Sequence, residues 1–142
     1  MKRLLISVCF IFLCLPALAW NERAAFESIE YLNNLVASNV ASYMQTLNSD
    51  YVKIQQIKKN KNLKQTEINK FANACVNRNK GLLKLYRTRY FKPAYNKYIE
   101  IDKSMSFENF IDSVAISEIS TFYQFYGFTE ANLRECEALT SR

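Results

Sequence analysis

The stretch TEINKFANACVNRNKGLLKLYRTRYFKP, residues 66–93, decides the fold class of this chain. Its apolar residues recur every three or four positions, which places them along one face of an α-helix. Thr66 can cap the start of this helix, and Pro93 predicts its end, because the residue before a proline is biased away from helical backbone angles. The predicted apolar face consists of Ile68, Phe71, Ala72, Cys75, Leu82, Leu83, Tyr86 and Tyr90.

The residues before this stretch predict further helices. Over residues 21–47 the apolar residues recur with the same period opposite a polar face, so we expect one long amphipathic helix. Asn48-Ser49-Asp50 offers a break and an N-cap before a shorter helical segment. Residues 58–64 are polar and cationic without periodicity, which predicts an exposed connection.

The residues after the stretch predict a central helix and a short last one. Residues 94–103 fit either a short helix or an extended segment. Ser106 is expected to cap a helix that is apolar around most of its girth, Gly127 to end it, and Thr129 to cap the last helix. The chain has only two glycines and two prolines, which leaves little material for the turns of a sheet. We therefore predict an all-α fold, a single small bundle of about four to six helices.

The start of the chain has the order of an export signal. Met1-Lys2-Arg3 precede the uncharged run of residues 4–15, and the small-residue site Ala17-Leu18-Ala19 follows. This order predicts a signal peptide over residues 1–19 that is cleaved near Ala19, since the run is much shorter than the roughly 20 residues of a membrane-spanning helix. Residues 20–142 are then expected to form one helical domain without a membrane span, in the periplasm or secreted.

Two of the four cysteines, Cys75 and Cys136, remain after this cleavage. An even pair in an oxidising compartment predicts a disulfide between them, and the alternative is two free buried thiols. Closing a loop of roughly 60 residues stabilises a fold by about 4 kcal/mol on the chain-entropy model. We therefore expect one disulfide to staple the bundle.

Positive charge is concentrated in the middle of the chain. Between Lys53 and Lys97 there are thirteen Lys or Arg and one acid, Glu67, whereas residues 20–52 and 98–142 are both net negative. One explanation is that acidic outer helices pair with the basic middle across solvated seams, where each pair contributes little. The other is that the surplus forms a cationic face that steers an acidic partner.

Within this basic block, residues 86–98, YRTRYFKPAYNKY, interleave five aromatic rings with four cations. Such a mixture suits stacking on nucleic-acid bases, and it suits a protein interface equally, because Tyr and Arg are common hot-spot residues. Export favours the protein interface, since nucleic acid is scarce outside the cytoplasm. The alternative is that Tyr86 and Tyr90 are core residues and the rest is merely solvated. The predicted partner-binding residues are Arg87, Arg89, Tyr90, Tyr95, Lys97 and Tyr98.

Two polar residues occupy positions where the helical period expects apolar ones. Asn79 lies between Cys75 and Leu83, and Glu118 lies in line with the apolar face of the central helix. A carboxylate in a core is costly unless it is paired. We therefore predict an internal ion pair between Glu118 and either Arg78 or Arg89, which would set the register of two helices.

The chain lacks the usual catalytic groups. It has no histidine, its two remaining cysteines are expected to be oxidised, and no glycine-rich phosphate loop or nucleophile elbow occurs. No carboxylate cluster has the spacing of metal ligands. We therefore predict a protein that is not an enzyme and that uses neither a cofactor nor a metal.

In size, export and helical content the chain resembles two broad groups of proteins. One comprises small periplasmic accessory proteins of secretion or pilus machines, and the other small periplasmic inhibitors that neutralise cell-wall-degrading toxins or lysozymes. The resemblance is one of type and carries no motif. It implies a binding protein of the bacterial envelope, so we expect an accessory or adaptor with another envelope protein as partner, one with an acidic surface. The alternative is an inhibitor or immunity protein, and the oligomeric state stays open.

Overall fold

The computed structural model describes residues 20–116 and 121–141, and every element in these ranges is helical. The predicted all-α class is therefore confirmed, while the predicted signal peptide lies outside the described residues. None of the described helices is long and apolar enough to cross a membrane. The elements are α1 (Glu22–Ala37), α2 (Val40–Lys59), α3 (Gln65–Tyr86), the π-helical segment η1 (Arg87–Phe91), α4 (Lys92–Ile101), α5 (Phe107–Ile116) and α6 (Thr121–Thr140).

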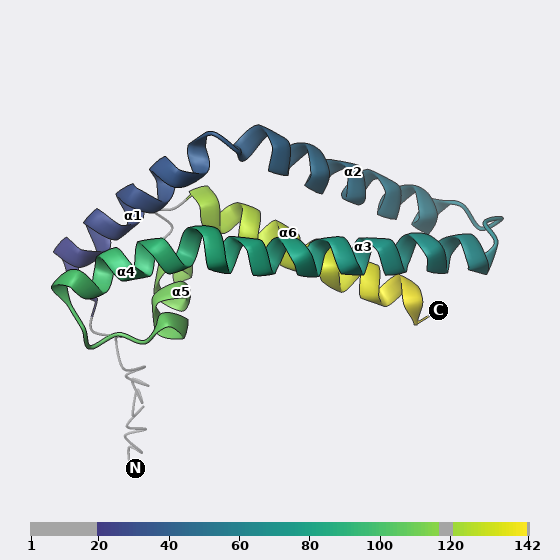
Figure 1. The fold of residues 1–142 in the computed structure, drawn as a ribbon. Helices are drawn as coiled ribbons and strands as arrows, with labels where there is room; N and C mark the ends of the chain where they lie inside the picture. Colours follow the sequence, from purple (N-terminus) through teal and green to yellow (C-terminus); the bar gives the residue numbers. More distant parts are fainter. Residues whose placement is uncertain (1–19, 117–120, 142) are drawn as a thin grey trace, which may run out of the picture.

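The helices form an elongated bundle around one continuous rod (Figure 1). That rod is made of α3, η1 and α4, which follow one another without an interruption. α1 packs against α4 at one end, and α6 packs along α3 over the rest of the length. α2 returns above α3 and meets it at a turn that forms the opposite end of the molecule (Figure 1). The fold therefore has two ends with different helix partners.

Pro93 does not end the helix, so this prediction was wrong. The chain passes from α3 through η1, and Pro93 lies in the first turn of α4. The amide of Lys92 bonds to the carbonyl of Arg87, five residues earlier. This wider turn adds a residue just before the proline, whose ring would otherwise clash with a carbonyl of the preceding α-helical turn. The ambiguous residues 94–103 mostly belong to α4 for the same reason.

Three further helix boundaries differ from expectation. The first break falls at Ser38-Asn39, and α2 runs through the expected break at residues 48–50. Asp50 is buried and accepts hydrogen bonds from another helix, so it does not cap its own. α3 begins at Gln65 with Lys64 as its N-cap, so Thr66 is not the cap.

The boundary expected near residue 127 was also wrong. α6 continues through Gly127, and the hydroxyl of Thr129 donates to the carbonyl of Phe125 at 2.7 Å instead of capping a new helix. This bond satisfies the buried hydroxyl within the helix, so no break is needed. Ser106 does act as predicted, because its Oγ accepts from the amide of Asn109 at 3.2 Å at the start of α5.

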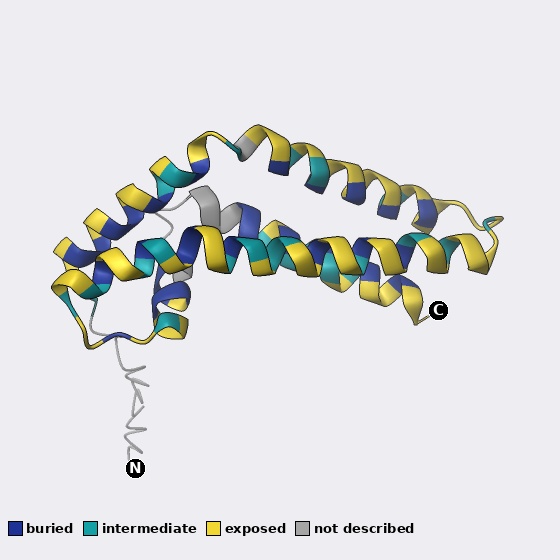
Figure 2. Cartoon of the chain, viewed as in Figure 1, coloured by how far each residue is buried: buried dark blue, intermediate teal, exposed yellow. Residues whose placement is uncertain are grey.

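The buried apolar residues form two cores. Figure 2 shows the buried positions along the helices, which on α2 lie on the side that faces α3. We call the larger one the aromatic core, because it holds eight buried rings between α1, α4, α5 and the facing parts of α2, α3, η1 and α6. The smaller one, the disulfide core, joins α2, α3 and the end of α6. The buried rings are Tyr43, Tyr86, Tyr90, Phe91, Tyr98, Phe110, Phe125 and Tyr126, and the disulfide core consists of Ile54, Ile57, Ala72, Cys75, Cys136 and Leu139.

Candidate partner-binding site

The predicted partner-binding residues divide between core and surface. Tyr90 and Tyr98 are 1% and 0% exposed, so they cannot contact a partner, and we leave them out of any binding surface. Tyr95 and Arg87 are half-buried, while Arg89 and Lys97 are exposed. The alternation of rings and cations thus reflects one helical rod with a buried side and a solvated side.

The two buried tyrosines bond to the other helices of the aromatic core. The Tyr90 and Tyr43 hydroxyl oxygens are 2.6 Å apart, which joins η1 to α2. The Tyr98 hydroxyl accepts from the amide of Asn21 at 3.0 Å and donates to Asp102 at 3.4 Å. Burial raises the pKa of Tyr98, and also that of Tyr43, where the bond to Tyr90 adds to the effect. The Tyr43 and Tyr90 hydroxyls therefore bond to each other, and that of Tyr98 bonds to Asn21 and Asp102.

Tyr95 and its two neighbouring cations hold α5 against the rod. The Tyr95 hydroxyl donates to the carbonyl of Met105 at 2.8 Å, and its ring lies 5.3 Å from that of Phe107. The Lys92 ammonium lies 4.9 Å from the centroid of the Phe107 ring of α5. Arg87 pairs with Glu108 of α5. This group is used for internal packing, and cation–π contacts of this kind stabilise the contact between helices.

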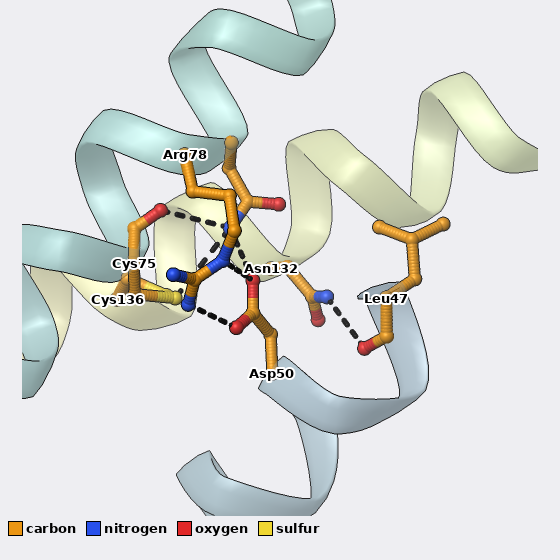
Figure 3. Close-up of a disulfide and its surroundings, with 7 residues drawn as sticks. Leu47, Asp50, Cys75, Arg78, Asn132 and Cys136 are labelled. Atoms are coloured by element: carbon orange, nitrogen blue, oxygen red, sulfur yellow. Dashed lines mark hydrogen bonds and ion pairs between the residues drawn. A yellow bond between two sulfur atoms is a disulfide. The ribbon is translucent and has the colours of Figure 1, made fainter. Parts of the chain in front are cut away.

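Glu118 lies outside the described residues, so its predicted pair with Arg78 or Arg89 stays a prediction. Arg78 pairs with Asp50, whose side chain is only 4% exposed and also accepts from Asn79 at 2.9 Å (Figure 3). Asn79 donates in addition to the carbonyl of Cys75 at 2.9 Å. The network lies beside the disulfide and gives the side-chain nitrogen of the buried Asn79 two oxygen acceptors.

The disulfide between Cys75 and Cys136 is present, with the two Cα atoms 5.9 Å apart. Both cysteines are fully buried, so the bond joins α3 to α6 inside the disulfide core. Near it, the Asn132 amide donates to the carbonyl of Leu47 at 3.1 Å, which ties α6 to α2 (Figure 3). Three helices are thus fastened together at this point.

A groove of about 460 Å³ with a mostly apolar lining lies between α2 and α6. Two aromatic side chains border it from opposite helices, Tyr51 at 56% and Phe128 at 57% exposed. Leu47 is buried, and the Asn132 side chain beside it is already bonded. The other lining residues are Met44, Asn48, Gln55, Ala131 and Glu135.

Sequence reasoning missed this groove because it placed a helix break at residues 127–129. In a continuous α6, residues 128, 131 and 135 form one stripe at helical spacing. Residues 44, 48, 51 and 55 form the matching stripe on α2. If Thr129 had been assigned to the interior of a helix, the two facing stripes could have been predicted from the sequence.

The described residues contain no group of three or more His, Cys, Asp or Glu that could hold a metal ion. The buried carboxylate of Asp50 is neutralised by Arg78 and accepts from Asn79, so it is committed to the fold. Comparisons of this chain with protein-family models, with curated proteins and with solved structures found no match.

Proposed function

We propose that this chain is a non-catalytic accessory or adaptor protein of the bacterial envelope, for instance of a pilus or secretion machine. It binds another envelope protein through the groove between α2 and α6. The observation that carries the proposal is the pair of exposed rings, Tyr51 and Phe128, on opposite walls of an apolar groove.

Exposed aromatic residues around an apolar hollow are typical of interaction sites. Four of the described rings are exposed, Phe26, Tyr31, Tyr51 and Phe128, and of these Tyr51 and Phe128 border the groove from opposite helices. Rings supply large contact areas with little loss of side-chain entropy, and they dominate binding hot spots. An apolar side chain or an amphipathic helix of the partner would fit between the two stripes.

The disulfide supports the envelope location, because such bonds form and persist in oxidising compartments. It lies behind the groove, where it joins α6 to α3, and the bond from Asn132 to Leu47 sets the distance between the two walls. A groove with fixed walls loses little entropy on binding.

The test is capture of envelope proteins by the wild-type chain and by a Tyr51→Gln, Phe128→Gln variant. We expect the variant to lose its specific partner, because two hot-spot rings typically contribute about 2 kcal/mol or more each. The matched control is Arg89→Gln with Lys97→Gln, which changes two exposed residues of the sequence-predicted surface. Loss of the partner in the control alone would move the site to that surface.

The inhibitor or immunity function is separated by a second measurement. An inhibitor protects cells against a cell-wall-degrading enzyme delivered to the periplasm, whereas a machine component does not. Protection that disappears in the Tyr51→Gln, Phe128→Gln variant would assign the groove to an inhibitor and contradict the accessory function. Absence of protection together with specific capture supports the proposal.

A further inference from the structure

The turn between α2 and α3 carries a dense group of lysines. Residues 53–70 contain six lysines and one acid, Glu67, and they form the end of the molecule opposite α1 and α4 (Figure 1). Five of these lysines are exposed and make no ion pair with any described residue. We call them the lysine tip: Lys53, Lys59, Lys61, Lys64 and Lys70.

Four cations outside the lysine tip pair with acids of another helix. Lys58 pairs with Glu135 and Lys80 with Glu137, both from the C-terminal half of α6. Arg78 and Arg87 pair with acids of α2 and α5. The first explanation of the basic block, that its cations pair with acidic helices, therefore holds for these residues but not for the lysine tip.

The net charge of the chain resides at this end. The whole chain carries +6, of which Lys2 and Arg3 contribute +2, so residues 20–142 carry +4. Residues 53–70 alone carry +5, and everything else in that range sums to −1. The C-terminus of α2 and the N-terminus of α3 both lie at this turn, so their opposite dipole charges largely cancel. The lysines alone thus set the field at the tip.

The chemistry of the tip favours a lipid surface over other polyanions. Residues 58–70 contain no aromatic ring on which a base could stack, as single-stranded nucleic acid requires. Lysine is depleted at protein interfaces, which prefer aromatic residues and arginine. An anionic membrane needs only point charges close to its plane, and it attracts clusters of four to eight lysines or arginines.

We propose that the lysine tip docks this protein end-on against a membrane surface rich in anionic phospholipids. The tip comprises the end of α2, the turn and the start of α3, so its lysines gather at one end of the molecule. Leu63 is half-buried and lines a shallow hollow with Lys53 and Lys59, which places one apolar side chain among the charges. The inference is independent of the groove between α2 and α6, which lies along the side of the bundle.

The test measures binding of the exported, disulfide-bonded chain to vesicles by co-sedimentation. Vesicles of phosphatidylcholine with phosphatidylglycerol are compared with vesicles of phosphatidylcholine alone, at low and at high salt. Each lysine near an anionic surface contributes about fivefold to the partition coefficient. Replacing Lys53, Lys59, Lys61 and Lys64 by Gln should therefore weaken binding by several hundredfold, roughly, and high salt should abolish it.

The matched control is a variant with Lys84, Lys97, Lys103 and Arg134 replaced by Gln. It has the same net charge as the tip variant, and its changes are exposed positions away from the tip. We expect it to keep binding within a few-fold of wild type, and both variants to keep wild-type helix content. Equal loss in the two variants would overturn the proposal, as would equal binding to neutral vesicles or no binding at all.

Two further outcomes keep this inference separate from the proposed function. Displacement of the bound chain from vesicles by single-stranded DNA at equal charge concentration would make the tip a nucleic-acid site and overturn the membrane proposal. Capture of an envelope partner by the tip variant should be unchanged, because its groove is intact. Loss of vesicle binding with retained capture is therefore the result that supports the lysine tip specifically.

Discussion

The aromatic core and the disulfide core both hold helices together, but they do so through different interactions. The aromatic core buries eight rings and fills the space between helices with side chains alone. The disulfide core has only six buried apolar residues, and it adds the bond between Cys75 and Cys136 and the pair of Asp50 with Arg78. Because small cores bury little apolar area, covalent and polar links take a larger share of the stabilisation there.

Removing the disulfide should have the largest effect and should separate the two cores. Replacing Cys75 and Cys136 by Ala is expected to lower the free energy of unfolding by about 4 kcal/mol. Hydrogen exchange should show α2 and the end of α6 losing protection before α1 and α4, since the aromatic core is left intact. Uniform loss of protection would mean that the two cores unfold as one unit.

Breaking the polar link should come next. Asp50→Ala leaves Arg78 without its acceptor and Asn79 with only the carbonyl of Cys75, and we expect a loss of about 3 kcal/mol in urea unfolding. The matched comparison is Arg78→Ala, which leaves the buried Asp50 carboxylate without its cation and should cost at least as much. A double-mutant cycle would report the coupling, and a coupling near zero would contradict a structural role for the pair.

Alkaline pH should act on the aromatic core alone. Burial raises the pKa of Tyr98 and of Tyr86 above the ordinary value of 10.0, so the folded chain keeps these protons where the unfolded chain loses them. This stability is fully present below about pH 10 and falls above it, by about 1.4 kcal/mol per pH unit for each ring. Tyrosinate absorbance should rise together with loss of helix, and gradual ionisation of the folded chain would contradict this.

The smallest effect should come from one hydroxyl. Tyr90→Phe keeps the ring but removes the bond to the Tyr43 hydroxyl, so we expect a loss of about 1 kcal/mol in thermal unfolding. Tyr43→Phe should give a similar value, and the double variant should lose little more than either one, because each change removes the same bond. Fully additive losses would show that the two hydroxyls act independently.

The binding surface was the part that sequence reasoning located least well. Tyr90 and Tyr98 belong to a stretch with the composition of a recognition site, yet both lie in the core, because one side of the rod faces the other helices along its length. Tyr51 and Phe128 were not predicted as binding residues, because each is a single aromatic residue in its own segment. Only the packing of α2 against α6 places them on facing walls. Composition thus indicates which residues can bind, while helix pairing decides which are available.

The sequence by itself determined the helical class, the pairing of its two later cysteines and the surplus of lysines at residues 53–70. These follow from local periodicity, from the count of available partners and from charge, none of which depends on the other helices. Tertiary structure alone decided where helices break. It also decided that a π-helical turn precedes Pro93 and lets the helix continue, and that Arg78 pairs with Asp50. Those choices depend on contacts between distant segments, because burial and pairing energies outweigh the smaller local preferences of single residues.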